Sequence, residues 1–306
     1  MGKLEINLTG LKLENPVILA AGILGISTET MRRVVKNGAG AVVTKSIGVE
    51  ARKGNRNPVV AKTPCGLLNS MGLPNPGVTE FRKELNGIDI GAPIIGSVYG
   101  FTKGEYVTVS KNLCEAGCDA IELNLSCPNV QGTGCLFGQN PSLVEEITRS
   151  VKKEIQEPLF VKLTPNVSDI TEIAKAAERG GADGVTAINT VMGMRINIDL
   201  ERPVLATGTG GLSGPAIKPI ALRSVYEIYQ IIDVPVIGCG GVMGWEDVVE
   251  FFLAGASAVQ LGTGIMEKGV EIFKRINKGL QLHLEKKGYS HISELIGKGI
   301  PNKERT

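Results

Sequence analysis

The stretch AGCDAIELNLSCPN, at residues 116–129, decides the fold because it joins a helix end to an apolar strand and then to a polar loop. Its first part resembles three other stretches: NGAGAVVT at 37–44, GGADGVTAI at 180–188 and AGASAVQLG at 254–262. In each of them a glycine with small neighbours precedes an apolar strand, and glycine commonly ends a helix in a left-handed conformation. This weak internal repeat predicts a helix-to-strand unit that is used several times.

The same unit of apolar strand, polar loop and amphipathic helix extends along the whole chain. We expect strands at 17–22, 41–46, 93–98, 120–126, 159–164, 184–190, 236–240 and 258–262. Helices are expected near 28–37, 77–86, 102–116, 142–156, 168–179, 216–231, 246–254 and 267–287. Eight strands alternating with eight helices favour an α/β fold of the (β/α)8 or TIM barrel type over an open doubly wound sheet. Longer insertions follow the second and sixth strands, at 47–76 and 191–215, and no linker divides residues 1–306, which we expect to form one domain.

Composition narrows the classes of function. Hydrophobic residues make up 42% of the chain and charged residues 21%, as in a globular protein, and the net charge of +2 gives no argument for nucleic acid or a membrane as partner. No apolar run approaches the roughly 20 residues of a spanning helix, and the start of the chain lacks signal-peptide character. The six cysteines include no CxxC pair, and the two histidines, His283 and His291, lie near the C-terminus. We therefore expect a cytosolic protein without zinc chemistry or histidine acid–base catalysis.

Polar residues collect at the C-terminal ends of the predicted strands, the end that carries the active site in a (β/α)8 barrel. Lys45 and Lys162 fall within otherwise apolar strands. Burying a lysine there costs free energy unless an anion or a dipole compensates its charge. They can serve an anionic ligand. The alternative is a structural ion pair, for example with Glu122, which shares a strand face with Asn124.

Glycine-rich turns follow the last two predicted strands, GCGG at 238–241 and GTG at 262–264, and TGGLSG at 209–214 precedes a helix that begins with proline. Backbone N–H groups in such turns can hold an anion, and this part of the barrel is a frequent phosphate site. The spacing does not match a dinucleotide fingerprint. One cluster is explained by a tight turn, but several clusters facing two lysines predict a phosphate-bearing ligand.

Cys127 follows a strand and precedes Pro128, a position that argues against the simple alternative of a small buried side chain. With no histidine on the predicted active face, its thiol is the strongest candidate for a base. Four asparagines can both donate and accept hydrogen bonds, which suits a flat substrate with carbonyl, N–H and carboxylate groups. They are Asn69, Asn124, Asn129 and Asn189.

Taken together, these motifs resemble those of the soluble class 1 dihydroorotate dehydrogenases, and the resemblance runs through nearly the whole chain. The matching stretches are VTKS at 43–46, NSMGL at 69–73, NLSCPN at 124–129, VKL at 161–163, INT at 188–190 and the three glycine clusters. The resemblance implies a (β/α)8 barrel with FMN over the strand ends. It also implies the oxidation of (S)-dihydroorotate to orotate in pyrimidine biosynthesis.

The resemblance implies a role for each matching residue. Cys127 corresponds to the base that takes the C5 proton while the C6 hydride passes to FMN, and the rest of the loop up to Phe137 corresponds to a lid. Positions that hold the substrate correspond to Lys45, Asn69, Met71, Gly72, Leu73, Asn124, Asn129, Asn189 and Thr190. Positions that hold FMN correspond to Ala21, Gly22, Lys45, Ser46, Ser97, Asn124, Lys162, Ile188, Gly214, Gly240, Gly241, Gly262 and Thr263.

Residues 193–196 and 207–223 are similar to the B-type of class 1, which passes electrons to NAD⁺ through a separate subunit carrying FAD and a 2Fe-2S cluster. This chain has neither a four-cysteine cluster spacing nor a dinucleotide fold, so those groups would belong to a partner subunit. The implied assembly is a heterotetramer built on a homodimer of this chain. Class 2 is disfavoured because its base is serine and it needs an amphipathic N-terminal anchor.

Three alternatives remain open at this point. The nearest is the A-type, a stand-alone homodimer that reduces fumarate. The others are another FMN barrel acting on pyrimidines and a barrel that binds a phosphorylated metabolite without redox chemistry. Three residues also depart from the family pattern: Ser97 stands where the B-type usually has asparagine, Ala21 replaces a commoner serine, and Cys135 is an additional thiol.

Overall fold

The computed structural model describes residues 2–125 and 137–301. At its centre is a closed barrel of eight parallel strands, in the order β10-β15-β16-β3-β4-β7-β8-β9. Their bounds are β3 Val17–Leu19, β4 Ala41–Val43, β7 Ile94–Val98, β8 Ala120–Asn124, β9 Leu159–Leu163, β10 Gly184–Ala187, β15 Val236–Cys239 and β16 Ala256–Leu261. The predicted (β/α)8 barrel is therefore confirmed.

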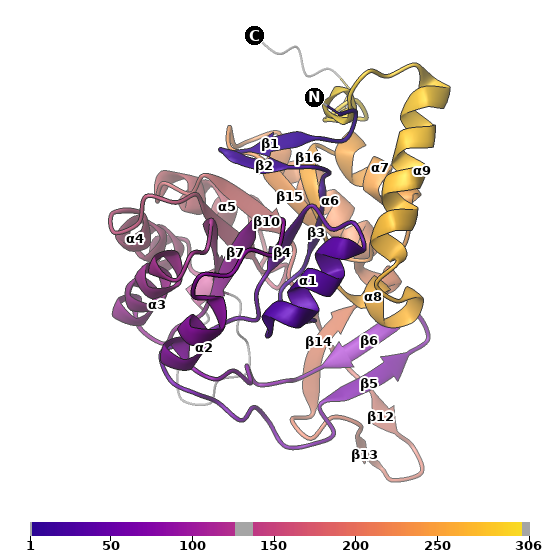
Figure 1. Ribbon diagram of the computed structural model, residues 1–306. Coiled ribbons are helices and arrows are strands. Elements are labelled where there is room, and N and C mark those ends of the chain that lie inside the picture. The colour runs from indigo at the N-terminus through magenta and orange to yellow at the C-terminus, as the bar shows by residue number, and fades with distance from the viewer. Residues whose placement is uncertain (1, 126–136, 302–306) are drawn as a thin grey trace.

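The helices surround this barrel, with α2 to α5 on one side and α6 to α9 on the other in Figure 1. They are α1 Thr28–Lys36, α2 Val78–Leu85, α3 Lys103–Glu115, α4 Pro141–Lys152, α5 Ile170–Arg179, α6 Lys218–Tyr229, α7 Trp245–Leu253, α8 Thr263–Lys268 and α9 Ile272–Lys287. The helix predicted near 267–287 is confirmed from 272 to 287 as α9, but its predicted start belongs to a separate helix, α8. Gly269, with φ +71°, ends α8, and α9 begins three residues later.

The repeat seen in the sequence has the expected geometry. A glycine with positive φ follows the end of each helix concerned: Gly38 (φ 98°), Gly117 (98°), Gly181 (91°) and Gly255 (114°). A left-handed residue at this point satisfies the last carbonyls of a helix and turns the chain toward the next strand. The strands that follow are buried almost throughout, as parallel strands covered by helices should be.

Apart from β7, which ends at Val98 as predicted, the barrel strands end one to three residues earlier than predicted, on the side where the polar residues begin. The strand expected at 41–46 ends at Val43, so Lys45 lies beyond the barrel ladder rather than within it. Its backbone N–H donates instead to the carbonyl of Gly25, at 2.8 Å. On its other side the chain still pairs with β7, because the N–H groups of Thr44 and Ile47 donate to the carbonyls of Ile95 and Ser97 at 2.9 and 2.8 Å.

The two insertions form a second sheet that the sequence did not predict. This four-stranded antiparallel sheet has the order β11-β14-β6-β5 and lies at the lower end of the barrel in Figure 1. Its strands are β5 Val60–Thr63, β6 Gly66–Asn69, β11 Val191–Met194 and β14 Thr209–Ser213, and a small extension carries β12 Ile196–Asn197 and β13 Arg202–Pro203. The hairpin of β1 Ile6–Leu8 and β2 Leu11–Leu13 covers the opposite end of the barrel.

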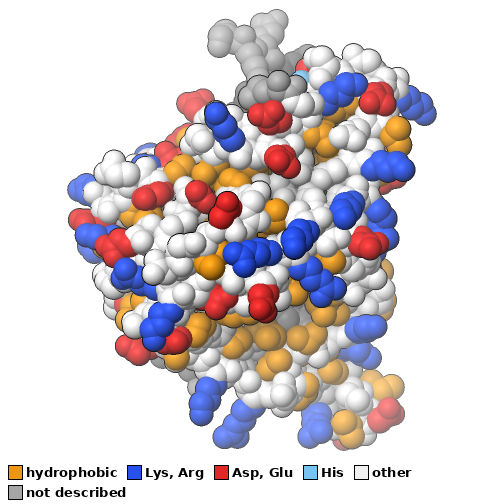
Figure 2. Space-filling model, viewed as in Figure 1, with side chains coloured by type: hydrophobic (Ala, Val, Ile, Leu, Met, Phe, Trp, Pro, Cys, Tyr) orange, Lys and Arg blue, Asp and Glu red, His pale blue; other side chains and the backbone are white. Residues whose placement is uncertain are grey.

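The surface shown in Figure 2 carries Lys and Arg side chains interspersed with Asp and Glu. This mixture agrees with the small net charge of the chain. Within the residues that the structure describes, no helix combines the length and the apolar character needed to cross a membrane.

Candidate functional site

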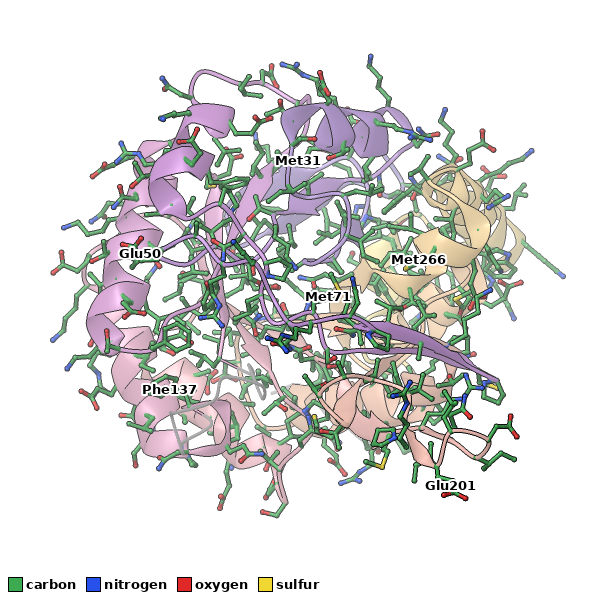
Figure 3. All side chains as sticks on the ribbon, turned by 90° about the horizontal axis from the view of Figure 1, so that it is seen from below. Met31, Glu50, Met71, Phe137, Glu201 and Met266 are labelled. Carbon is green, nitrogen blue, oxygen red and sulfur yellow. The ribbon has the colours of Figure 1, made fainter. Side chains whose placement is uncertain are left out.

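A cavity of about 420 Å³ lies at the C-terminal end of the barrel, between the strand ends and the four-stranded sheet. Its volume falls in the range of roughly 300–1,000 Å³ that is usual for small-molecule sites. Figure 3 looks onto this end of the barrel, with Met71 near the middle of the ring of helices and Glu201 at its outer edge. Met71 belongs to the wall of the cavity.

The structure brings nearly all of the sequence-predicted site residues that it describes to this one cavity. The walls contain Ala21, Gly22, Lys45, Ser46, Asn69, Met71, Gly72, Leu73, Asn124, Lys162, Ile188, Asn189, Thr190, Gly214, Gly240, Gly241, Gly262 and Thr263. Ser97 is the exception among the described residues: it is fully buried and lies behind Ser46, with the two Oγ atoms 2.9 Å apart.

The predicted base and its loop lie outside the described residues. These are Cys127, Asn129 and Cys135, together with most of the predicted lid. Phe137, where the description resumes, packs edge-on against Tyr106, with ring centroids 6.1 Å apart. Tyr106 also donates a hydrogen bond of 3.1 Å from its hydroxyl to the carbonyl of Asn124. Tyr106 therefore contacts both Asn124 and Phe137.

A row of amide and hydroxyl groups crosses one side of the cavity. The Nδ2 of Asn124 donates to Ser46 Oγ at 3.1 Å, and the Nδ2 of Asn189 donates to the Oδ1 of Asn124 at 3.3 Å. The backbone N–H of Thr190 donates to the Oδ1 of Asn189 at 2.7 Å. These bonds fix the orientation of the amides, so the row can present defined donors and acceptors to a planar polar ligand.

Asn75 holds the wall formed by residues 71–73. Its Nδ2 donates to the carbonyl of Leu73 at 2.9 Å and to Tyr99 Oη at 2.8 Å, and its Oδ1 accepts from the N–H groups of Gly48 and Gly77. Leu73 has φ +57°, a left-handed conformation that is uncommon for leucine and costs free energy. Because Asn75 is buried and fully engaged, we infer that it stabilises this conformation and with it the cavity wall.

Lys162 belongs to a buried polar network beneath the cavity. Its Nζ donates to Gln260 Oε1 at 2.6 Å and lies 3.6 Å from Glu122 Oε1. The other carboxylate oxygen, Oε2, accepts from the Nε2 of Gln260 and, at 2.8 Å, from the Oγ1 of Thr186. The ion pair with Glu122, which was the alternative drawn from the sequence, is therefore present for Lys162. The lysine nevertheless also lines the cavity.

The charge of Lys162 is maintained by this network. Burial lowers its pKa, but the electrostatic attraction of Cys239 and Glu122 outweighs burial and leaves the pKa above its ordinary value. Burial also raises the pKa of the Cys239 thiol. Glu122, whose Oε1 lies 3.6 Å from the ammonium, is the acidic partner that the barrel places beside Lys162.

The glycine turns form a narrow backbone cradle at the other side of the cavity. Gly240 (φ 132°) and Gly241 (φ 77°) adopt conformations that other residues rarely take, and a Cβ on Gly240 would lie 2.9 Å from that of Ala221. A Cβ on Gly22 would meet nothing within 4 Å. Ser213 and Thr263 join their hydroxyls across the cradle at 2.8 Å. A phosphate group could fit here, because the wall offers open space, hydroxyl groups and backbone N–H groups that a ligand can approach closely.

Several residues of the site were missed from the sequence. Gln260 and Cys239 line the cavity, and Thr186 and Asn75 support it from behind. Gln260 is the single polar residue in the apolar stretch 258–261, which is the same signal that singled out Lys162. Applied to every strand, that signal would have found it.

Comparison with known proteins agrees with this arrangement. The family model described as dihydroorotate dehydrogenase matches residues 3–284. This chain belongs to the dihydroorotate dehydrogenase family. A relative from Pyrococcus abyssi is 49% identical, covering 96% of this chain and 98% of the relative. Another from Methanosarcina acetivorans is 51% identical, covering 95% and 94%.

A third relative, from Methanocaldococcus jannaschii, is 46% identical and covers 96% of this chain and 97% of its own length. All three are named dihydroorotate dehydrogenase B (NAD(+)), catalytic subunit. Membership in the dihydroorotate dehydrogenase family thus confirms the resemblance drawn from the motifs, and the similarity to B-type proteins extends over nearly the whole chain.

We expect Asn75→Ala to lower the free energy of unfolding by about 3 kcal/mol, because it removes several buried hydrogen bonds worth roughly 0.5–1.5 kcal/mol each. Tyr99→Phe removes only one of these bonds and should cost about 1 kcal/mol. Urea unfolding of both variants measures the difference. Equal losses in the two variants would contradict the role given to Asn75 in holding the wall.

Proposed function

We propose that this protein oxidises (S)-dihydroorotate to orotate, as the B-type catalytic subunit of a dihydroorotate dehydrogenase in pyrimidine biosynthesis. The observation that carries the proposal is the joint placement, around one cavity, of the amide row, Lys162 and the glycine cradle. The relatives, which match nearly end to end, carry that activity in their names. A cytosolic location is part of the same proposal.

The cavity fits FMN at both of its ends. Gly240, Gly241, Gly262 and Thr263 would hold the phosphate through backbone N–H groups and one hydroxyl, and Lys162 would face the flavin ring as a buried cation. When bound, FMN supplies the acceptor for the hydride that leaves the substrate. A positive charge near the ring favours its anionic reduced form.

The amide row would bind and orient the substrate. Asn124 and Asn189 are fixed by their mutual hydrogen bond, so their remaining donor and acceptor positions point in set directions. With Asn69, Lys45 and the wall at 71–73 they suit the carbonyl, N–H and carboxylate groups of dihydroorotate. The apolar side chains of Met71 and Leu73 in that wall would help to keep water from the reacting carbon.

Cys127 is proposed as the general base that takes the proton from C5, on the strength of its place in the NLSCPN motif. We expect Cys127→Ala to retain its FMN and to lose about 100-fold or more of its rate of dihydroorotate oxidation, because a positioned base typically contributes 10²–10⁴-fold. Cys135→Ala is the matched control, since it removes a second thiol eight residues further on. Steady-state rates with an artificial dye as acceptor compare the two. Loss of activity in the Cys135 variant alone would move the base to that residue.

The electron acceptor is proposed to be NAD⁺, reached through a partner subunit that carries FAD and a 2Fe-2S cluster. The relatives are named as NAD(+)-linked catalytic subunits, which supports a separate electron-transfer chain. Among the described residues, no group of three or more His, Cys, Asp and Glu side chains could hold a metal ion. A homodimer of this chain with two such partner subunits is the proposed assembly.

An exposed apolar segment beside the cavity supports contact with another protein. It follows the cavity residue Thr190 along the chain and includes Met192, Met194, Ile196, Ile198 and Leu200, of which Ile198 is 83% exposed. Grouped exposed apolar side chains are typical of interaction surfaces.

The acceptor is tested by purifying the chain alone and together with the products of neighbouring genes. We expect the lone chain to oxidise dihydroorotate with a dye but not with fumarate, and the complex to reduce NAD⁺. NADH formation followed by absorbance, beside fumarate consumption, separates the two types. Rapid fumarate reduction by the lone chain would assign it to the A-type instead.

A further inference from the structure

Glu122 is a buried carboxylate that the proposed reaction does not use. It is fully buried on β8 and does not line the cavity, whereas Lys162 on β9 does. Glu122 thus reaches the space assigned to the flavin through Lys162, whose ammonium lies 3.6 Å from its Oε1. An anion in that position lowers the stability that the site could have, because a buried ion pair often stabilises a protein less than apolar residues of similar volume would.

The network extends across the barrel. Gln260 lies on β16, and three strands separate β16 from β8 in either direction around the barrel. Its side chain reaches over this distance, accepting from Lys162 through Oε1 and donating to Glu122 through Nε2. Thr186 on β10 gives the carboxylate its second donor. Groups from four strands thus fix the positions of one anion and one cation.

The Lys162 ammonium and the Glu122 carboxylate lie close together without a short hydrogen bond between them. The short hydrogen bond of Lys162 goes to the neutral Gln260, while the carboxylate oxygen nearest to the lysine is 3.6 Å away and has no hydrogen-bond donor among the described residues. Glu122 consequently acts on Lys162 mainly through its electric field. In a buried site such a field is poorly screened by water, so it also extends into the cavity.

We propose that Glu122 is a positioning residue that fixes Lys162 and offsets its charge toward the flavin, so that it lowers the reduction potential of bound FMN. The proposal rests on FMN occupying the cavity, as argued above. A lysine facing the ring without a counter-charge would bind the anionic reduced flavin more tightly. The buried carboxylate reduces that preference and leaves the electrons easier to pass to the next acceptor.

An isosteric substitution of Glu122 tests whether this residue lowers the reduction potential of bound FMN. Glu122→Gln removes the negative charge and keeps a side chain that can accept from Gln260 and Thr186. We expect the ratio of affinities for reduced over oxidised FMN to rise by about tenfold, which is about 30 mV for a two-electron couple. Equilibration with reference dyes measures the potential, at about pH 6 so that the lysine stays protonated in the variant.

Two further variants make the result specific. Thr186→Val removes a hydrogen bond to Glu122 without changing any charge, and its ratio should stay within about twofold of the unmodified protein. Glu122→Asp keeps the charge paired but withdraws it from Lys162, so it should shift the potential upward by less than Glu122→Gln does. If Glu122→Gln does not fold, the potential of Glu122→Asp tests the proposal: an upward shift supports it, and no shift contradicts it.

A potential in the Glu122 variants that matches the Thr186 variant, or that falls, would overturn the proposal. That result is distinct from a failure of the proposed function. The function fails if the unmodified protein binds no FMN or does not oxidise dihydroorotate. The role of Glu122 fails if FMN binds and dihydroorotate is oxidised while the potential does not respond to the loss of the carboxylate.

Discussion

The cost of burying the Lys162 ammonium in the barrel is the constraint on which the site depends. A cation at this depth requires hydrogen bonds and a counter-charge, and Gln260 and Glu122 supply them from strands on opposite sides of the barrel. The amide row of Asn124 and Asn189 continues from the same strand ends. A closed parallel barrel is well suited to this, because all its strands deliver their C-terminal ends to one place.

The insertions after β4 and β10 complete the site by adding a wall to the barrel. β6 and β14 pair across a long stretch of sequence, and their sheet brings Asn69 and Gly211 to one side of the cavity. The barrel provides the cation, the amides and the glycine cradle, and the added sheet encloses them. Ligand binding and the exclusion of water are thus divided between two parts of the fold.

The barrel could be predicted because its signals are local: a positive-φ glycine after a helix and an apolar strand after the glycine. The second sheet could not, since its strands are short and the pairing of β6 with β14, which joins the two insertions into one sheet, is a tertiary contact far apart in the sequence. Most site residues were found through motifs at strand ends. Ser97 shows the limit of that reasoning, because alternation along β7 does not tell whether a side chain reaches the cavity or lies behind Ser46. Gln260 is the opposite case: it lies in the site and contacts Lys162, although none of the sequence motifs contains it.

The central claim is that this cavity holds a flavin that accepts electrons from dihydroorotate. The most direct measurement is an anaerobic absorbance titration of the purified chain with (S)-dihydroorotate, without any added acceptor. We expect a yellow protein whose visible flavin band is bleached, with one molecule of orotate formed per flavin. A colourless protein, or a flavin band that dihydroorotate leaves unchanged, would contradict it.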